Sequence, residues 1–335
     1  MAYIYKRKTS SGEYYYLRTS VRKGNRVISK NVAYLGNSLE KAKIKLSELK
    51  GHDKEIRKNK RKIDRFFESE YYINKARSKK YKKNELLGEL QNEIEACKIH
   101  FDSKFIKEHK LTRDDIWLDF LVLYSQNSVA IEGNTITVPQ ARDLIINRVT
   151  PNNKDLREVY DLENHKRLFF SLFGSKKSIN EKLIQEIHNQ LMENIDSRKG
   201  YRTRDVRVVG GFGRAFKTTT HTYISTDMKK LLEWYEDNKN KLHPIVLSAI
   251  FHHKFESIHP FFDGNGRTGR MILNYMLMLH GYPPVIIKNK LRSEYYNALR
   301  SVTAESSYEK STIKYKPIIE EIGQSLIQSY WDVFL

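Results

Sequence analysis

The chain of 335 residues is 39% hydrophobic and 30% charged, which is typical of a soluble globular protein with one sizeable core and a smaller second domain. It contains no run of about 18 apolar residues, the length that a membrane-spanning helix needs, and its first residues lack the apolar core of a signal peptide. We therefore expect a cytoplasmic protein without membrane partners. Cys97 is the only cysteine, which excludes an intrachain disulfide and a cysteine-based zinc site.

The net charge of +20 is concentrated in the first third of the chain. Up to residue 110 the sequence holds 29 Lys and Arg against 14 Asp and Glu, and the remainder holds 31 against 26. A localised basic surface attracts polyanions, whereas a dispersed excess mainly favours solubility. The N-terminal region is therefore a candidate for binding nucleic acid, and simple solvation of its charges is the alternative.

Residues 1–37 are predicted to form a small basic β-sheet module. Aromatic and β-branched runs alternate there with turn signals that contain glycine, as in a three-stranded meander. Residues 38–111 follow with a helical, lysine-rich pattern and thin apolar stripes, which indicates a helical basic connector. A small basic sheet with exposed tyrosines could bind nucleic acid through its phosphates and by stacking. Docking of a target protein or of the helical domain is the alternative.

Residues 112–335 are predicted to form a mainly α domain, because amphipathic segments recur along them. A helix over about residues 114–132 opens this domain. One interruption, residues 201–225, alternates like the strands of a β-hairpin around several glycines. The predicted fold class is therefore mainly α, with the β-meander and the helical connector preceding the helical domain.

The segment most able to carry chemistry is HPFFDGNGRTGR, from His259 to Arg270. Pro260 disfavours the α conformation at His259, so the preceding helix should end near Ile258. The next helix should begin around Gly266. Free backbone N–H groups and the positive end of the dipole at that helix start suit an anion, and glycines let phosphate oxygens approach the backbone closely.

The side chains around this predicted anion site suit nucleotide chemistry. His259 titrates near neutral pH and can take a proton from an attacking hydroxyl. Asp263 can bind Mg²⁺, which prefers one or two carboxylates together with the phosphate oxygens of a substrate. Arg267 and Arg270 lie about one turn apart on the following helix, where both can hold phosphates.

Residues 264–269 also satisfy the GxGxxG dinucleotide fingerprint, but their context argues against that function. The fingerprint requires a preceding strand and an acidic residue about 20 positions further on. Here residues 244–258 are predicted to be helical, and the corresponding position lies near Asn289. A Walker A loop is excluded as well, because no Gly-Lys-Ser/Thr follows the glycines.

The twelve residues His259–Arg270 resemble the HPFxxGNGRxxR signature of the Fic (Fido-fold) family at every defined position. Similarity extends to flanking segments over residues 115–330, and the hairpin at 201–225 resembles the flap beside the family's active site. The resemblance implies a Fic helical core that transfers AMP from ATP to a Ser, Thr or Tyr hydroxyl of a protein. Phosphotransferring relatives of the Doc type have a lysine where this chain has Gly266, which disfavours kinase activity.

The resemblance also implies a role for each matching residue. His259 would be the general base, and Asp263 would be the Mg²⁺ ligand. The ATP would be bound by an anion hole, two phosphate-binding arginines and a tyrosine that packs on the adenine. In chain order these residues are Gly264, Asn265, Gly266, Arg267, Arg270 and Tyr296.

A second signature, SVAIEGN at residues 128–134, resembles the inhibitory motif of the same family, in relatives that carry the inhibitory helix N-terminally (class II). On a helix Ser128 and Glu132 share one face, and Gly133 is a suitable cap. A Glu132 carboxylate directed at Arg270 would occupy the guanidinium that should bind the γ-phosphate. The resemblance thus implies autoinhibition by competition for one arginine.

Two functions remain open from the sequence. The first is a protein AMPylator that uses ATP and Mg²⁺ and modifies a protein substrate, which can be the protein itself. The second is a nucleic-acid-binding regulator whose Fic core is vestigial, uses another nucleotide or removes AMP. The intact His259 and Asp263 favour the first. A homo-oligomer is compatible with either function.

Overall fold

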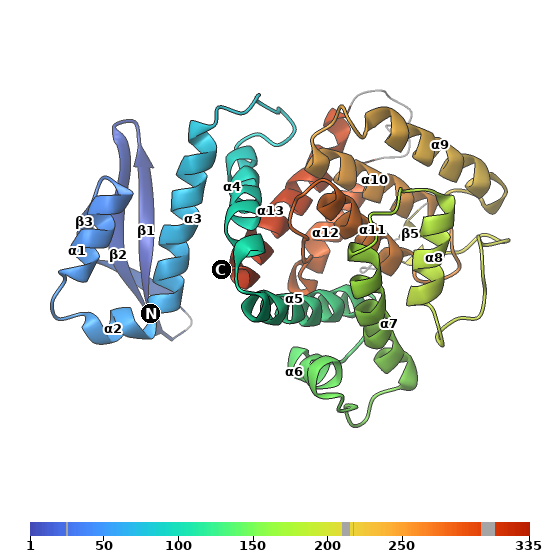
Figure 1. The fold of residues 1–335 in the computed structure, drawn as a ribbon, viewed down its shortest axis with the longest axis horizontal. Coiled ribbons are helices and arrows are strands. Elements are labelled where there is room, and N and C mark those ends of the chain that lie inside the picture. Colours follow the sequence, from blue (N-terminus) through green and yellow to red (C-terminus); the bar gives the residue numbers. More distant parts are fainter. Residues whose placement is uncertain (25, 210–214, 217, 303–311) are drawn as a thin grey trace. The chain divides into compact units, whose positions relative to one another are not determined.

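The computed structural model describes residues 1–24, 26–209, 215–216, 218–302 and 312–335. The described residues form two compact units, residues 1–81 and residues 82–334 (Figure 1). The sequence predicts domain boundaries at other positions, after residues 37 and 111. The helices that directly follow the sheet pack against it, and the helix after residue 89 packs against the C-terminal helix.

The first unit is an antiparallel sheet with helices packed on one face. Its elements are β1 (Ala2–Thr9), β2 (Gly12–Lys23), β3 (Arg26–Gly36), α1 (Leu39–Ser47), α2 (Asp53–Lys58) and α3 (Lys60–Ser78). The strands lie in the order β1, β2, β3, which confirms the predicted meander. Ile4, Leu17 and Leu35 from the strands form the core of this unit with Ile63 and Phe67 of α3. The thin apolar stripe of α3 therefore covers the sheet.

The second unit consists mainly of α-helices. They are α4 (Leu90–Ser103), α5 (Lys110–Ile131), α6 (Val138–Arg142), α7 (Leu156–Phe173), α8 (Glu181–Leu191), α9 (Ile224–Asn238), α10 (Pro244–Ile258), α11 (Asn265–Leu279), α12 (Arg292–Arg300) and α13 (Lys316–Val333). Short helical turns join them at η1 (Phe105–Lys107), η2 (Asp143–Asn147), η3 (His221–Tyr223), η4 (Asn289–Leu291) and η6 (Ile313–Tyr315). The predicted mainly α fold is confirmed.

Helices α10 and α11 form the centre of the second unit. Helix α10 contacts α9, α11 and α13, and most of its side chains are buried. Pro244 occupies its first turn, where the missing N–H group costs nothing. The helix ends at Ile258, as predicted, and α11 begins at Asn265. The polar segment 259–264 therefore links two buried helices.

The predicted hairpin is present as the antiparallel strands β4 (Val208–Val209) and β5 (Ala215–Phe216). Residues 210–214 and 217 of this segment lie outside the described residues. The helix predicted over about residues 114–132 corresponds to α5, which starts somewhat earlier, at Lys110. Among the helices that the structure describes, none combines the length and the apolar character needed to cross a bilayer.

Candidate active site

Side chains hold the loop between α10 and α11 in one conformation. His259 and Gly264 have left-handed backbones, with φ of 53° and 75°, which turn the chain out of α10 and into α11. The Asn265 side chain bridges the loop: Nδ2 donates to the Phe261 carbonyl at 2.8 Å, and Oδ1 accepts from the Phe261 amide at 2.9 Å. Arg202 Nε donates to the His259 carbonyl at 2.9 Å. The loop is therefore preorganised.

His188 of α8 supports the loop from the other side. Its ring stacks on Phe261 with centroids 3.7 Å apart and planes inclined by 9°. Its Nε2 lies 3.0 Å from the carbonyl oxygen of Asp263, and burial lowers the pKa of His188, so the neutral ring donates this hydrogen bond. The sequence does not reveal this partner of His188.

The start of α11 is in contact with an anionic side chain. A Cβ atom on Gly266 would clash with Oε1 of Glu132 and would lie 2.9 Å from Nη1 of Arg270. Only glycine leaves room for the Glu132 carboxylate at this position. Because a helix start carries a partial positive charge, the carboxylate lies where the sequence predicts that an anion binds.

Arg270 holds this carboxylate and the helix that carries it. Its Nη2 donates to Oε1 of Glu132 at 2.8 Å and to the Ser128 carbonyl at 2.7 Å, and its Nε donates to the Ser128 hydroxyl at 3.1 Å. The Arg270 side chain is only 3% exposed. Burial alone would lower the pKa of Arg270, but the Glu132 carboxylate and other nearby groups outweigh burial and raise the pKa above its ordinary value. The guanidinium therefore stays charged. Gly133, with φ of 101°, turns the chain away after Glu132.

His259 is neutral at physiological pH. Burial lowers the pKa of His259 to about 4, although the Glu132 carboxylate opposes this shift. The imidazole can therefore accept a proton near pH 7. Tyr296 lies close to Glu132 and donates a hydrogen bond of 3.4 Å to the Ile131 carbonyl. Burial raises the pKa of Tyr296, and Glu132 adds to the rise, so the phenol stays protonated.

Asp263 presents a partly exposed carboxylate, with its side chain 36% accessible. Oδ1 accepts from the Gly264 amide at 2.6 Å and from Nη2 of Arg267 at 3.2 Å, and Oδ2 accepts from Arg157. Within the described ranges, no three His, Cys, Asp or Glu side chains gather as a metal site. A single accessible carboxylate beside an anion site fits Mg²⁺, because this ion takes one or two carboxylates and otherwise waters and phosphate oxygens.

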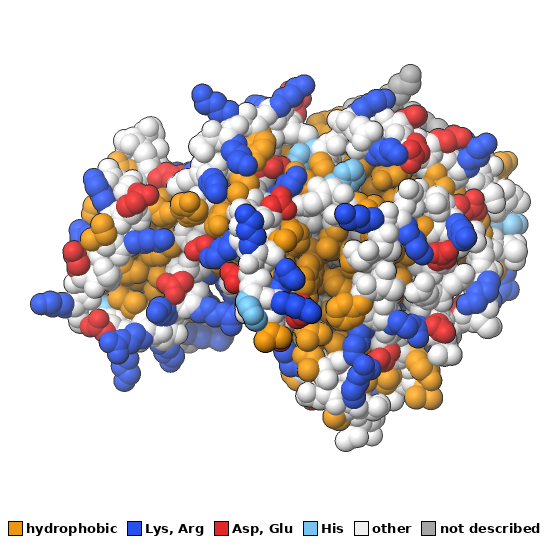
Figure 2. Space-filling model, in the orientation of Figure 1, with side chains coloured by type: hydrophobic (Ala, Val, Ile, Leu, Met, Phe, Trp, Pro, Cys, Tyr) orange, Lys and Arg blue, Asp and Glu red, His pale blue; other side chains and the backbone are white. Residues whose placement is uncertain are grey.

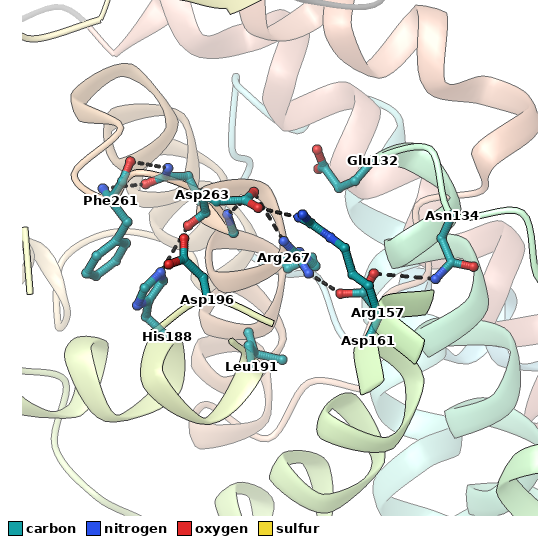
Figure 3. A network of polar contacts seen from close by, with 12 residues as sticks. Glu132, Asn134, Arg157, Asp161, His188, Leu191, Asp196, Phe261, Asp263 and Arg267 are labelled. Carbon is teal, nitrogen blue, oxygen red and sulfur yellow. Dashed lines mark hydrogen bonds and ion pairs between the residues drawn. The ribbon is translucent and has the colours of Figure 1, made fainter. Parts of the chain in front are cut away.

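Two residues of α7 that the sequence did not indicate complete the site. Arg157 and Asp161, one turn apart, point toward Asp263 and Arg267 and form ion pairs with them (Figure 3). Asn134, the last residue of the inhibitory motif, donates to Oδ2 of Asp161 at 3.4 Å. The Arg267 side chain is 3% exposed, and two carboxylates hold it.

We expect the buried pair of Asp161 and Arg267 to contribute strongly to stability. Replacing Asp161 with alanine leaves a buried guanidinium with one charged partner fewer, and loss of one partner of a buried ion pair costs about 3 to 5 kcal/mol. Urea denaturation measures the free energy of unfolding. The control is Asp119→Ala, which removes an exposed ion pair with Arg142 and should cost at most about 1 kcal/mol. Equal losses for both variants would contradict this expectation.

Comparison with known proteins relates the second unit to one family of domains. Residues 178–277 match the family model described as Fic/DOC family, so the chain carries a Fic domain. The chain is 34% identical over 179 residues to "Protein adenylyltransferase Fic" of Drosophila grimshawi, covering 52% of this chain and 36% of that protein. It is also 34% identical over 185 residues to "Protein adenylyltransferase fic-1" of Caenorhabditis elegans, covering 53% and 35%. The chain thus spans little more than a third of these curated relatives.

Solved structures show the same fold. A Fic domain containing signalling protein of Bacteroides thetaiotaomicron has a TM-score of 0.63 at 25% identity, covering 71% of this chain and 95% of that chain. Fic-1 of Caenorhabditis elegans has a TM-score of 0.60 at 25% identity, covering 73% and 70%. The likeness includes most of the second unit's length and confirms the Fic fold.

Proposed function

We propose that this chain is a protein adenylyltransferase, which transfers AMP from ATP to a Ser, Thr or Tyr hydroxyl of a protein substrate. The observation that carries this proposal is a neutral His259 beside a helix start that accommodates an anion. The names of the curated relatives support it.

The proposed reaction assigns each event to a group of this chain. His259 takes the proton of the attacking hydroxyl, whose oxygen bonds to the α-phosphorus of ATP. The bond from that phosphorus to the bridging oxygen of the β-phosphate breaks, and pyrophosphate leaves. The backbone of residues 264–266 and the Arg270 guanidinium hold the phosphates, with Arg267 beside them. Asp263 would hold Mg²⁺, which would neutralise part of the negative charge of the phosphates.

The same geometry supports autoinhibition as part of the proposal. The Glu132 carboxylate and the γ-phosphate are both anions that pair with Arg270, so they compete for one buried guanidinium. Glu132 also lies against Gly266, where the triphosphate would approach the helix start. ATP binding therefore requires that Glu132, at the end of α5, moves away from Arg270 and Gly266. Tyr296, which touches the end of α5, would then pack on the adenine.

The experiment that tests the reaction uses the position of a radioactive label. The protein is incubated with Mg²⁺ and ATP labelled either at the α-phosphate or at the γ-phosphate. AMP transfer predicts protein-bound label from the α-position and none from the γ-position. Label from the γ-position would indicate phosphotransfer. Absence of label in both the unmodified protein and the Glu132→Gly variant would refute the proposed enzymatic function.

We propose nucleic-acid binding as a second function, located in the first unit. Residues 1–81 hold 23 Lys and Arg against 8 Asp and Glu, whereas the following residues to 110 are balanced. Figure 2 shows Lys and Arg side chains over the visible face of this unit, with Asp and Glu among them. Because binding to phosphates releases counterions, we expect the affinity for an oligonucleotide to fall at least 10-fold between about 50 and 200 mM salt. Fluorescence anisotropy measures this, and weak binding that salt leaves unchanged would contradict it.

A further inference from the structure

The outer face of the three-stranded sheet carries a row of tyrosines. Tyr16 on β2 pairs with Tyr5 on β1 and with Tyr34 on β3, so the three side chains follow one another across the sheet. The rings of Tyr16 and Tyr34 lie 5.3 Å apart, and Tyr14 lies 6.4 Å from Tyr34. Neighbours along each strand, such as Leu17, point to the opposite face, where the core lies.

Cations accompany these rings. The Arg18 guanidinium lies 3.8 Å from the centroid of the Tyr5 ring, and Nε of Arg18 donates to Asn31 at 2.6 Å. The Lys45 amine lies 5.4 Å from the centroid of the Tyr34 ring. Beyond the row, β2 and β3 continue as a hairpin, and the exposed side chain of Arg22 lies on the same face as Tyr16 and Arg18. The face therefore combines flat rings with positive charge.

Acidic side chains are nearly absent from the strands. Glu13 is the one acidic residue among residues 1–37. It pairs with Lys6 at 3.3 Å and with Arg77 at 3.1 Å, so its charge is compensated. A partner that binds this face must tolerate uncompensated positive charge and gain from contact with rings. An anionic chain with planar groups has both properties.

We propose that this tyrosine face binds single-stranded nucleic acid, with bases stacked on Tyr16, on Tyr34 and on the Arg18 guanidinium that covers Tyr5. This proposal rests on the nucleic-acid function proposed above and specifies its site and ligand. Adjacent strands are about 4.8 Å apart, so three rings span about 10 Å, enough for two or three bases. Base stacking on aromatic side chains needs unpaired bases, because the faces of paired bases are covered within the duplex. Single strands therefore fit this face better than duplex.

The test uses the full chain and a fluorescein-labelled oligothymidylate of about 20 nucleotides, followed by anisotropy. Tyr34 is 43% exposed, so its replacement by alanine should leave the fold intact. Tyr34→Ala is expected to raise Kd at least 5-fold, since stacking contributes about 1 to 3 kcal/mol per base. Tyr34→Phe keeps the ring and should bind like the unmodified protein. The matched control is Tyr71→Ala, a tyrosine of α3 that is 51% exposed and lies outside the row.

Several outcomes would overturn the tyrosine face as the site. One is equal weakening by Tyr34→Ala and Tyr71→Ala, and another is tighter binding of the matching duplex than of the single strand. Competition by polyglutamate as strong as that by oligothymidylate would indicate a surface for acidic proteins. Salt-sensitive binding with the same Kd in Tyr34→Ala as in the unmodified protein would refute only this site and would still support nucleic-acid binding by the first unit. No binding to any oligonucleotide would refute both.

Discussion

Glycine in place of Glu132 is expected to tighten ATP binding by about 10- to 100-fold, because charge-assisted hydrogen bonds contribute about 1.5 to 3 kcal/mol. The substitution frees Arg270 and clears the space against Gly266 that the carboxylate occupies. Position 132 caps α5 and lies at its exposed end, so glycine should not disturb the helix. Titration calorimetry with Mg²⁺ and ATP measures the affinity, and α-labelled ATP measures the parallel rise in self-modification.

A charge-neutral variant separates the two effects of Glu132. Glu132→Gln keeps the volume of the side chain but removes the ion pair with Arg270, so we expect an ATP affinity between those of the unmodified protein and Glu132→Gly. The hydrogen bonds from Arg270 to Ser128 remain in both variants. An unchanged Kd for ATP in Glu132→Gly would show that the carboxylate does not compete with the triphosphate, and the autoinhibition would have to be abandoned.

The local chemistry of the site could be predicted from the sequence because it depends on neighbours in the chain. Pro260 after His259 predicted the end of α10, and the four-residue spacing of Ser128 and Glu132 predicted that both face one partner. The resemblance to a family then supplied that partner, Arg270. In the structure the three side chains meet.

Other contacts could not be predicted, because they join segments far apart in the chain. The ion pair of Arg157 with Asp263 spans 106 positions. Nothing in the sequence of α7 distinguishes Arg157 from a charged residue on a solvated helix face. Likewise the lysine-rich composition of residues 38–81 obscures how few apolar side chains are needed to cover a small sheet. Ile63 and Phe67 suffice to place α3 on the core of the first unit.

Alanine in place of His259 is expected to lower the rate of AMP transfer by about 100- to 10,000-fold, the usual contribution of a general base. The measurement is best made in the Glu132→Gly background, where the starting rate is higher. ATP affinity should change little, because the phosphates are held by the helix start and Arg270 rather than by the imidazole. A loss of ATP binding equal to the loss of rate would contradict the role of His259 as a base.

The pH dependence provides an independent check on the same residue. Burial lowers the pKa of His259 to about 4, so the base is already neutral at pH 6, and the rate should stay level between about pH 6 and pH 8. It should fall as the pH drops toward 4, because the imidazole then takes up a proton. The Glu132 carboxylate raises this pKa, so its removal shifts the fall to still lower pH. A rate that instead rises about threefold from pH 6 to pH 7 would indicate a base with an unshifted pKa, and the buried imidazole would not be the group that accepts the proton.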